Sequence, residues 1–285
     1  MKKLLILLLI FVQNSLAKHF MIVALPRSGS TFFAKTYCSA SKGKYLMDPN
    51  KDFYKLKEFF TMGNCYFGAH IMDYWGCKKG NMFECLSQEN FDLNYDQSLF
   101  KLGMNASKEV MSYGNISHYH KKFDMMCLIR KREHTFPSSM PQLFILMYQA
   151  FLYASLQNEN YKKLRTYLKS LVYTDKEQQC AGYIAAMYVL ITECKKYGIP
   201  ILRFEKWMTL KGERLDNYFK EYFPKDYYNK EFAPLLEKTR SKLNGSEEAW
   251  LKERKKRYEK WGMEPFMQKI LSFIKTMDSG FDIDE

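Results

Sequence analysis

Residues 24–31 combine small, hydroxyl-bearing and basic side chains in one turn-like segment, Ala-Leu-Pro-Arg-Ser-Gly-Ser-Thr. If a helix begins near Ser30, its first backbone N–H groups and the positive end of its dipole point into the turn. Gly29 allows the backbone to approach a phosphate closely, and Arg27 can place a guanidinium on the same oxygens. Further donors are the hydroxyl groups of Ser28, Ser30 and Thr31. The segment therefore predicts a site for a nucleotide diphosphate or a phosphosulfate.

This segment differs from the Walker A loop of kinases and ATPases, which reads Gly-x4-Gly-Lys-Ser/Thr. Ala24 stands in place of the first glycine of that pattern, and Ser30 stands in place of its lysine. A kinase without the lysine would lack its usual contact to the transferred phosphate. NTP hydrolysis is therefore the less favoured chemistry, and a P-loop-type nucleotide kinase is kept as an alternative.

Short apolar runs alternate with helical segments along the chain. Strands are expected at residues 20–25, 65–72, 123–129 and 199–204. Helices are expected at residues 32–39, 143–157, 176–196 and 215–222, and residues 247–275 are strongly helical. Such alternation is typical of a parallel sheet that is covered by helices on both faces. We therefore expect an α/β fold, with residues 18–285 forming a single domain.

The loop at residues 26–31 resembles the 5'-phosphosulfate loop of sulfotransferases that use 3'-phosphoadenosine 5'-phosphosulfate (PAPS). Arg130 follows an expected strand, and Ser138 comes eight residues later, as in sulfotransferases. The resemblance implies that this pair holds the 3'-phosphate of the nucleotide, with Arg240 or Lys242 as further contacts. It also implies a P-loop-like three-layer α/β/α sandwich with a central parallel sheet, the sulfotransferase fold.

Within the superfamily, the chain is most similar to the bacterial trehalose-type sulfotransferases. The matching segments follow one another in the same order along nearly the whole chain. They are Gly-Ser-Thr-Phe-Phe at 29–33, Phe-Gly-Ala-His-Ile-Met-Asp-Tyr-Trp at 67–75, the segment at 198–207 that ends in Arg-Phe-Glu-Lys-Trp, and the segment at 235–250 that leads into Arg257 and Tyr258.

The chain departs from that subgroup at the catalytic base. The subgroup carries a Pro-x-Glu-aromatic segment soon after the loop, whereas this chain reads Asp-Pro-Asn-Lys-Asp-Phe at residues 48–53. Asp52 is the first candidate for the base and Asp48 the second. His70, which replaces the usual lysine of the Phe-Gly segment, is the third. The residue that takes the acceptor proton is therefore left open among these three.

The resemblance implies an enzyme that moves a sulfonate group from PAPS to an acceptor hydroxyl, with a carbohydrate or glycolipid preferred as acceptor. Arg27 would neutralise charge on the leaving phosphate. The missing glutamate keeps a second alternative, a non-catalytic glycan- or nucleotide-binding protein of the same fold. We expect no nucleic-acid partner, because the basic helix near residues 252–260 has the composition of a solvated face. The oligomeric state is left open.

The N-terminal residues and the sequons indicate where in the cell the protein is expected. Lys2 and Lys3 precede an apolar run, and small residues suited to cleavage follow, so residues 1–17 are expected to be a signal peptide. That run is shorter than the about 20 residues needed to span a membrane, so no stable membrane span is expected. Together with sequons at Asn105, Asn115 and Asn244, the expected signal peptide predicts a glycoprotein that is located in the secretory lumen or is secreted.

The formal net charge of +13 favours anionic partners, and the seven cysteines show no CxxC spacing. The cysteine pattern therefore predicts no zinc site, and PAPS is expected as co-substrate without a metal. If the protein enters the secretory pathway, Cys65, Cys77 and Cys85 are expected to take part in disulfides. Cys127, inside an apolar strand, is expected to be a free thiol.

Overall fold

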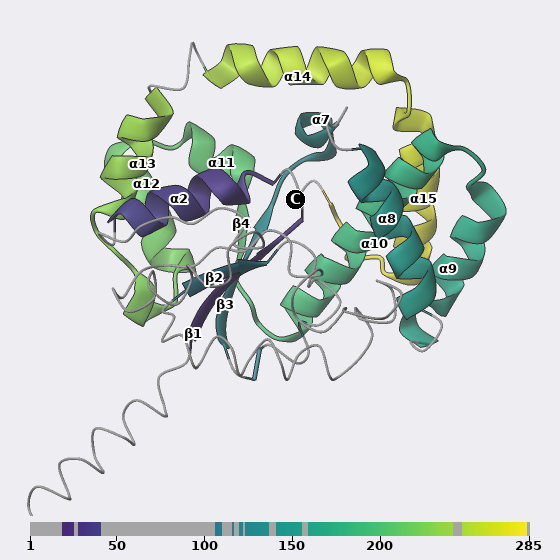
Figure 1. Ribbon diagram of the computed structural model, residues 1–285, viewed down its shortest axis with the longest axis horizontal. Helices are drawn as coiled ribbons and strands as arrows, with labels where there is room; N and C mark the ends of the chain where they lie inside the picture. The colour runs from purple at the N-terminus through teal and green to yellow at the C-terminus, as the bar shows by residue number, and fades with distance from the viewer. Residues whose placement is uncertain are drawn as a thin grey trace, which may run out of the picture.

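Figure 1 shows the computed structural model of the chain. The structure describes residues 19–25, 28–40, 106–109, 116, 120–121, 123–136, 141–155, 159–241 and 247–283. Several sequence predictions lie outside these residues. They are the signal peptide, the strand at 65–72, the three sequon asparagines and the cysteines at 65, 77 and 85.

Among the residues that the structure describes, four parallel strands form the sheet. They are β1 (His19–Ala24), β2 (Ala106–Glu109), β3 (Phe123–Ile129) and β4 (Ile201–Arg203). The strands predicted at 20–25, 123–129 and 199–204 are confirmed as β1, β3 and β4. β1 and β3 are near-continuous apolar runs, as expected for strands with both faces buried. The mixed α/β class and the parallel sheet predicted from the sequence are therefore confirmed.

The order of the described strands is β2-β1-β3-β4. Ala24 pairs with Leu128, and Ile129 pairs with Arg203, so β1, β3 and β4 end close to one another at the carboxyl edge of the sheet. From β1 the chain passes to β2 on one side and then returns to β3 on the other side. β1 and β3 therefore flank a topological switch point, the place where open parallel sheets bind their ligands.

Helices lie on both sides of the sheet (Figure 1). On one side are α2 (Ser30–Ala40), α11 (Phe204–Thr209), α12 (Gly212–Tyr222) and α13 (Phe232–Ser241), with the short 3-10 turn η4 (Lys225–Tyr227) between α12 and α13. On the other side are α8 (Pro141–Ala154), α9 (Glu159–Leu171), α10 (Asp175–Lys196) and α15 (Glu264–Met277). Among the residues that the structure describes, no helix has the length and apolar character to cross a membrane.

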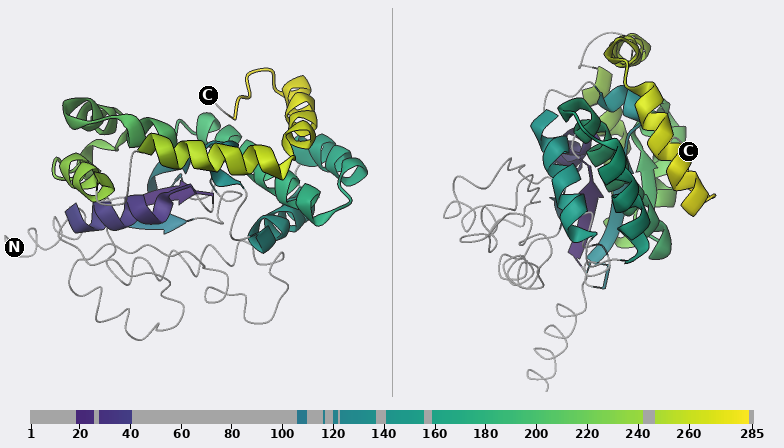
Figure 2. Two further views of the ribbon diagram at one scale, coloured as in Figure 1. Left: turned by 90° about the horizontal axis from the view of Figure 1, so that it is seen from above. Right: turned by 90° about the vertical axis from the view of Figure 1, so that its right-hand side faces the viewer.

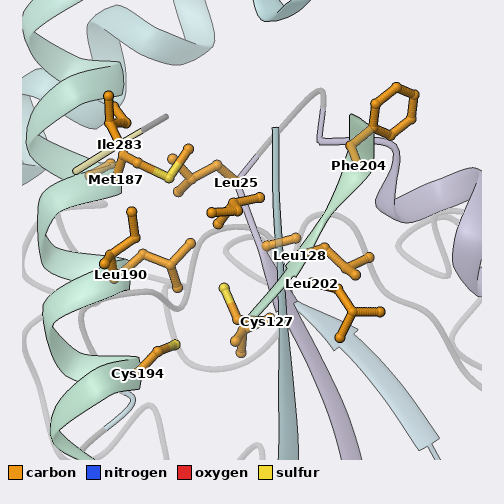
Figure 3. Close-up of a cluster of buried hydrophobic side chains, with 14 of the residues drawn as sticks. Leu25, Cys127, Leu128, Met187, Leu190, Cys194, Leu202, Phe204 and Ile283 are labelled. Atoms are coloured by element: carbon orange, nitrogen blue, oxygen red, sulfur yellow. The ribbon is translucent and has the colours of Figure 1, made fainter. Parts of the chain in front are cut away.

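The core between α10 and the sheet is apolar and contains two thiols (Figure 3). Met187, Leu190 and Cys194 of α10 point toward the strands, where Cys127 of β3 points back toward the helix (Figure 3). Leu128 points to the opposite face of the sheet, because successive residues of a strand alternate. Cys127 is a buried free thiol, as predicted, and burial raises its pKa well above the usual value.

The helical tail predicted at 247–275 consists of two helices, α14 (Glu247–Trp261) and α15. Gly262 separates them with a φ of +75°, a conformation that favours glycine and ends α14. Pro265 lies in the first turn of α15, where proline is tolerated because its missing N–H is not needed. The Gly-x-x-Pro spacing of residues 262–265 is the local signal for this break.

Gly182 sets the distance between α8 and α10. A Cβ atom on Gly182 would lie 2.0 Å from the carbonyl oxygen of Phe144 and 2.8 Å from the nitrogen of Tyr148. We expect Gly182→Ala to lower the free energy of unfolding by about 3 kcal/mol or more, because backbone atoms of α8 must move. Urea denaturation measures this loss. Gly280→Ala, where a Cβ would make only an ordinary contact at 3.6 Å, is the control. Equal stabilities of the two variants would contradict the close packing of α8 and α10.

Candidate functional site

The turn between β1 and α2 presents the start of a helix to the carboxyl edge of the sheet. The N–H of Ser28 donates to the carbonyl of Leu25 at 3.3 Å, and the N–H of Phe33 donates to the carbonyl of Gly29 at 3.0 Å. Gly29 therefore stands at the N-cap of α2, so the N–H groups of the first turn of α2 point toward the turn. These groups and the dipole of α2 form a site that attracts anions.

Gly29 is required here for two reasons. Its φ is +82°, a conformation that side chains other than glycine rarely adopt. In addition, a Cβ atom at this position would lie 2.6 Å from two ring atoms of Phe204, the first residue of α11. The backbone of the turn therefore packs directly on the Phe204 ring.

Arg130 lies on the same ring, from the next strand of the sheet. It directly follows β3, it is 7% exposed, and its Cζ atom lies 4.3 Å from the centroid of Phe204. A guanidinium at this distance from an aromatic face is attracted by about 0.5–2 kcal/mol. The hydroxyl of Tyr183 donates to the carbonyl of Arg130 at 2.6 Å and so attaches its backbone to α10. Phe204 thus joins the turn after β1 to the arginine after β3.

Glu205 accepts hydrogen bonds from the part of the chain that follows Arg130. One of its carboxylate oxygens accepts a hydrogen bond from the N–H of Lys131 at 3.1 Å and another from Nδ1 of His134 at 2.6 Å. His134 belongs to the short helix α7 (Arg132–Thr135) and is 6% exposed, and its Nε2 lies 3.5 Å from Glu133. The second residue of α11 therefore holds the β3–α7 turn, while the first contacts Arg130 and Gly29.

Buried polar atoms that have no hydrogen-bond partner among the described residues include two at this edge that matter for a ligand. One is Oγ of Ser28, a residue that is 2% exposed, and another is Nε1 of Trp207 on α11. The Trp207 ring stacks on Phe32 with centroids 6.2 Å apart and meets Phe204 edge-on at 4.9 Å. A buried polar group without a partner costs about 1–3 kcal/mol. The indole N–H can only donate, so the site is suited to a ligand that supplies acceptor oxygens.

The structure brings four of the predicted site residues to one edge: Ser28, Gly29, Ser30 and Arg130. Ser30 is buried, and the backbone of Thr31 lies in α2, although its side chain is outside the described residues. Also outside them lie Arg27, Asp52, His70, Ser138 and Lys242, together with Asp48. Their predicted roles therefore stay predictions.

Arg240 is buried against the end of α11. Its two terminal nitrogens donate to the carbonyl of Trp207 at 2.7 Å and to the carbonyl of Leu210 at 2.8 Å. These are the contacts of a residue that caps a helix C-terminus. Arg240 thus holds the helix that carries Phe204 and Trp207, and the phosphate contact predicted for it stays a prediction.

Sequence reasoning missed three residues that organise this edge: Phe204, Glu205 and Trp207. The signal was available, because Phe204 ends the strand predicted at 199–204, Glu205 and Trp207 come directly after it, and the residues at the ends of parallel strands gather at one edge of the sheet. Within the part of the chain that the structure describes, no group of acidic, histidine or cysteine side chains is arranged to hold a metal ion.

We expect Gly29→Ala to remove anion binding, because the added methyl group pushes the turn off Phe204. Its control is Gly262→Ala, since Gly262 has a similar φ of +75° but nothing within 4 Å of its Cβ position. Both variants should lose about 1–3 kcal/mol of stability from backbone strain. The melting temperature, measured with and without pyrophosphate, should rise with the anion in Gly262→Ala and not in Gly29→Ala. An equal rise in both variants would exclude the turn as the anion site.

Comparison with known proteins assigns no family to this arrangement. No protein-family model, no curated protein and no solved structure matches the chain. The function must therefore be inferred from the chemistry of the residues at the carboxyl edge.

Proposed function

We propose that the protein is a sulfotransferase that moves a sulfonate group from PAPS to an acceptor hydroxyl. The observation that carries this proposal is the meeting of the Ser28–Ser30 turn and Arg130 on the Phe204 ring, at the switch point of a parallel sheet. PAPS has two anionic groups, a 5'-phosphosulfate and a 3'-phosphate. A site for such a molecule needs two adjacent groups of anion donors, and this edge has both.

The N-terminus of α2 suits the 5'-phosphosulfate. Its first-turn N–H groups, the buried hydroxyls of Ser28 and Ser30 and the indole N–H of Trp207 are donors that a phosphosulfate can satisfy. Arg27 and Thr31 complete this group in the sequence prediction. Arg130, together with Ser138, would hold the 3'-phosphate. With this assignment the finer description of the fold, a P-loop-like three-layer α/β/α sandwich, is part of the same proposal.

The residues of the site favour sulfonate transfer over NTP chemistry. Ser30 stands where a kinase would have its lysine, so the helix start provides hydroxyl and N–H donors but no cation for a γ-phosphate. Sulfonate transfer can proceed by positioning the two reactants and stabilising the charge on the leaving bisphosphate. Arg27 would supply that charge stabilisation, and Asp52, Asp48 or His70 would accept the proton of the acceptor hydroxyl.

The rigid contacts around Arg130 suit such a reaction. Tyr183 and Glu205 hold the backbone on either side of Arg130, and Phe204 contacts its guanidinium. Donors held in advance lose little energy when charge develops on the bound molecule. A carbohydrate or glycolipid hydroxyl in the secretory lumen is the acceptor we propose, in line with the sequence resemblance.

The donor site can be tested by calorimetric binding of adenosine 3',5'-bisphosphate, compared with ATP. We expect the wild-type protein to prefer the bisphosphate and Arg130→Ala to weaken its binding about 10- to 100-fold, because a hydrogen bond to a charged group contributes about 1.5–3 kcal/mol. Arg214→Ala removes an exposed arginine of α12 and should leave the affinity unchanged. A preference for ATP, or full affinity in Arg130→Ala, would refute the sulfotransferase assignment.

The role of Phe204 can be tested with Phe204→Leu, which keeps an apolar side chain but removes the ring. We expect bisphosphate binding to weaken about 3- to 30-fold, because the cation–π attraction of about 0.5–2 kcal/mol that positions Arg130 is lost. Phe219→Leu is the matched control, since Phe219 is buried in the aromatic core of α2, α12 and α13. Equal affinity in the two variants would show that the ring is only a core residue.

A further inference from the structure

Helix α14 crosses the carboxyl edge of the sheet. In Figure 1 it runs above α7, from the end of α13 toward α15, and the view from above in Figure 2 shows it passing over the middle of the molecule. Its C-terminal end is anchored there. The Trp261 ring stacks on Phe136 with centroids 4.8 Å apart, and the Tyr258 hydroxyl bonds to Glu264. α14 therefore lies next to the turn that carries Arg130.

The two faces of α14 differ in chemistry. Leu251, Arg254, Tyr258 and Trp261 recur every three or four residues and are buried or half-buried, so they form the inward face. Outside this face lie the exposed side chains of Lys252, Lys256 and Lys260, which follow one line along the helix, and of Lys255 on its flank. We call these four lysines the α14 basic face.

The exposed side chains around the α14 basic face are charged rather than apolar. Glu253 and Glu259 are acidic residues exposed beside these lysines, and Glu253 is paired with Arg257 at 3.0 Å. Lys252, Lys256 and Lys260 follow one another at intervals of one helical turn, about 6 Å along the axis. The exposed positions between 252 and 260 are all charged. A partner would therefore be recognised through regularly repeated negative charge rather than through an apolar anchor.

We propose that the α14 basic face binds a sulfated or carboxylated polysaccharide, whose hydroxyls are presented to the neighbouring site for sulfonation. This inference rests on the proposed function and names its acceptor class. A single-stranded nucleic acid is a poorer fit, because it needs aromatic rings for base stacking, and Tyr258 and Trp261 are turned inward. A peptide is also a poorer fit, because groove and sheet-edge recognition use apolar pockets or unpaired backbone, and acidic peptide motifs are bound by clusters of arginine, whereas this surface carries lysines.

The test is calorimetric binding of a size-defined heparin oligosaccharide at an ionic strength of about 0.1 M. The variant is Lys252→Glu/Lys255→Glu/Lys256→Glu, which changes only exposed side chains. Each lysine beside an anionic surface contributes about fivefold to affinity, so the variant should bind about 100-fold more weakly. The control is Lys163→Glu/Lys169→Glu/Lys176→Glu, which changes the net charge equally at exposed positions on α9 and α10.

A loss of heparin binding in the α14 variant, with the control close to wild type, supports the proposal. An equal loss in both variants would show a general effect of net charge, and no loss in the α14 variant would place binding elsewhere; both results overturn it. Tighter binding of polyglutamate or of single-stranded DNA than of heparin, lost in the same variant, would also overturn it in favour of those partners.

Binding of adenosine 3',5'-bisphosphate separates this inference from the proposed function. The α14 variant should keep the wild-type affinity for the bisphosphate, since none of its three lysines is among the residues assigned to the bisphosphate site. Loss of heparin binding with intact bisphosphate binding would overturn only the proposal that α14 binds a polysaccharide. Absence of bisphosphate binding to the wild-type protein would overturn the proposed sulfotransferase function, whether or not heparin binds.

Discussion

The contact between the Gly29 backbone and the Phe204 ring is the constraint on which the site depends. Gly29 follows β1 and Phe204 follows β4, so their contact requires these strands to end at the same level. Arg130, after β3, lies between these strands in the sheet order and also contacts the ring. Any larger residue at position 29 would separate the helix start from the arginine. A parallel sheet thus supplies the frame, and one aromatic ring sets the spacing of the two groups of anion donors.

The residues around this ring are held by hydrogen bonds to the helices. Tyr183 reaches Arg130 from α10, Glu205 holds Lys131 and His134, and Arg240 holds the end of α11. Because these hydrogen bonds are buried or partly buried, breaking one leaves a polar group with neither a protein nor a water partner. Deforming the arrangement therefore costs free energy. Such an arrangement positions donors before the ligand arrives, which is what electrostatic stabilisation of a leaving group requires.

Helix α14 is attached to the elements that form the carboxyl edge of the sheet. Its inward face is attached to α7 and α15 through Trp261, Tyr258 and Glu264, and Arg132 of α7 also reaches Glu264 at 3.0 Å. The turn after β3 and the basic helix are therefore connected through one carboxylate. The helix keeps its lysines in solvent because Leu251, Tyr258 and Trp261 lie on its inward face.

The sequence by itself determined the strands β1 and β3, the helix that follows β1, the long helix α10 and the places of the glycine-serine turn after β1 and of Arg130 after β3. These features are local, since an apolar run or a glycine-serine turn is recognisable without its neighbours. Strand β2, with the polar sequence Ala-Ser-Lys-Glu, carries no such signal, because its extended form depends on pairing with β1. Only the tertiary structure decided that Phe204 contacts both Gly29 and Arg130, that Glu205 braces the next turn and that Arg240 caps α11. Each of these contacts joins residues far apart in the chain, so its existence depends on strand order and helix packing, which no local pattern specifies.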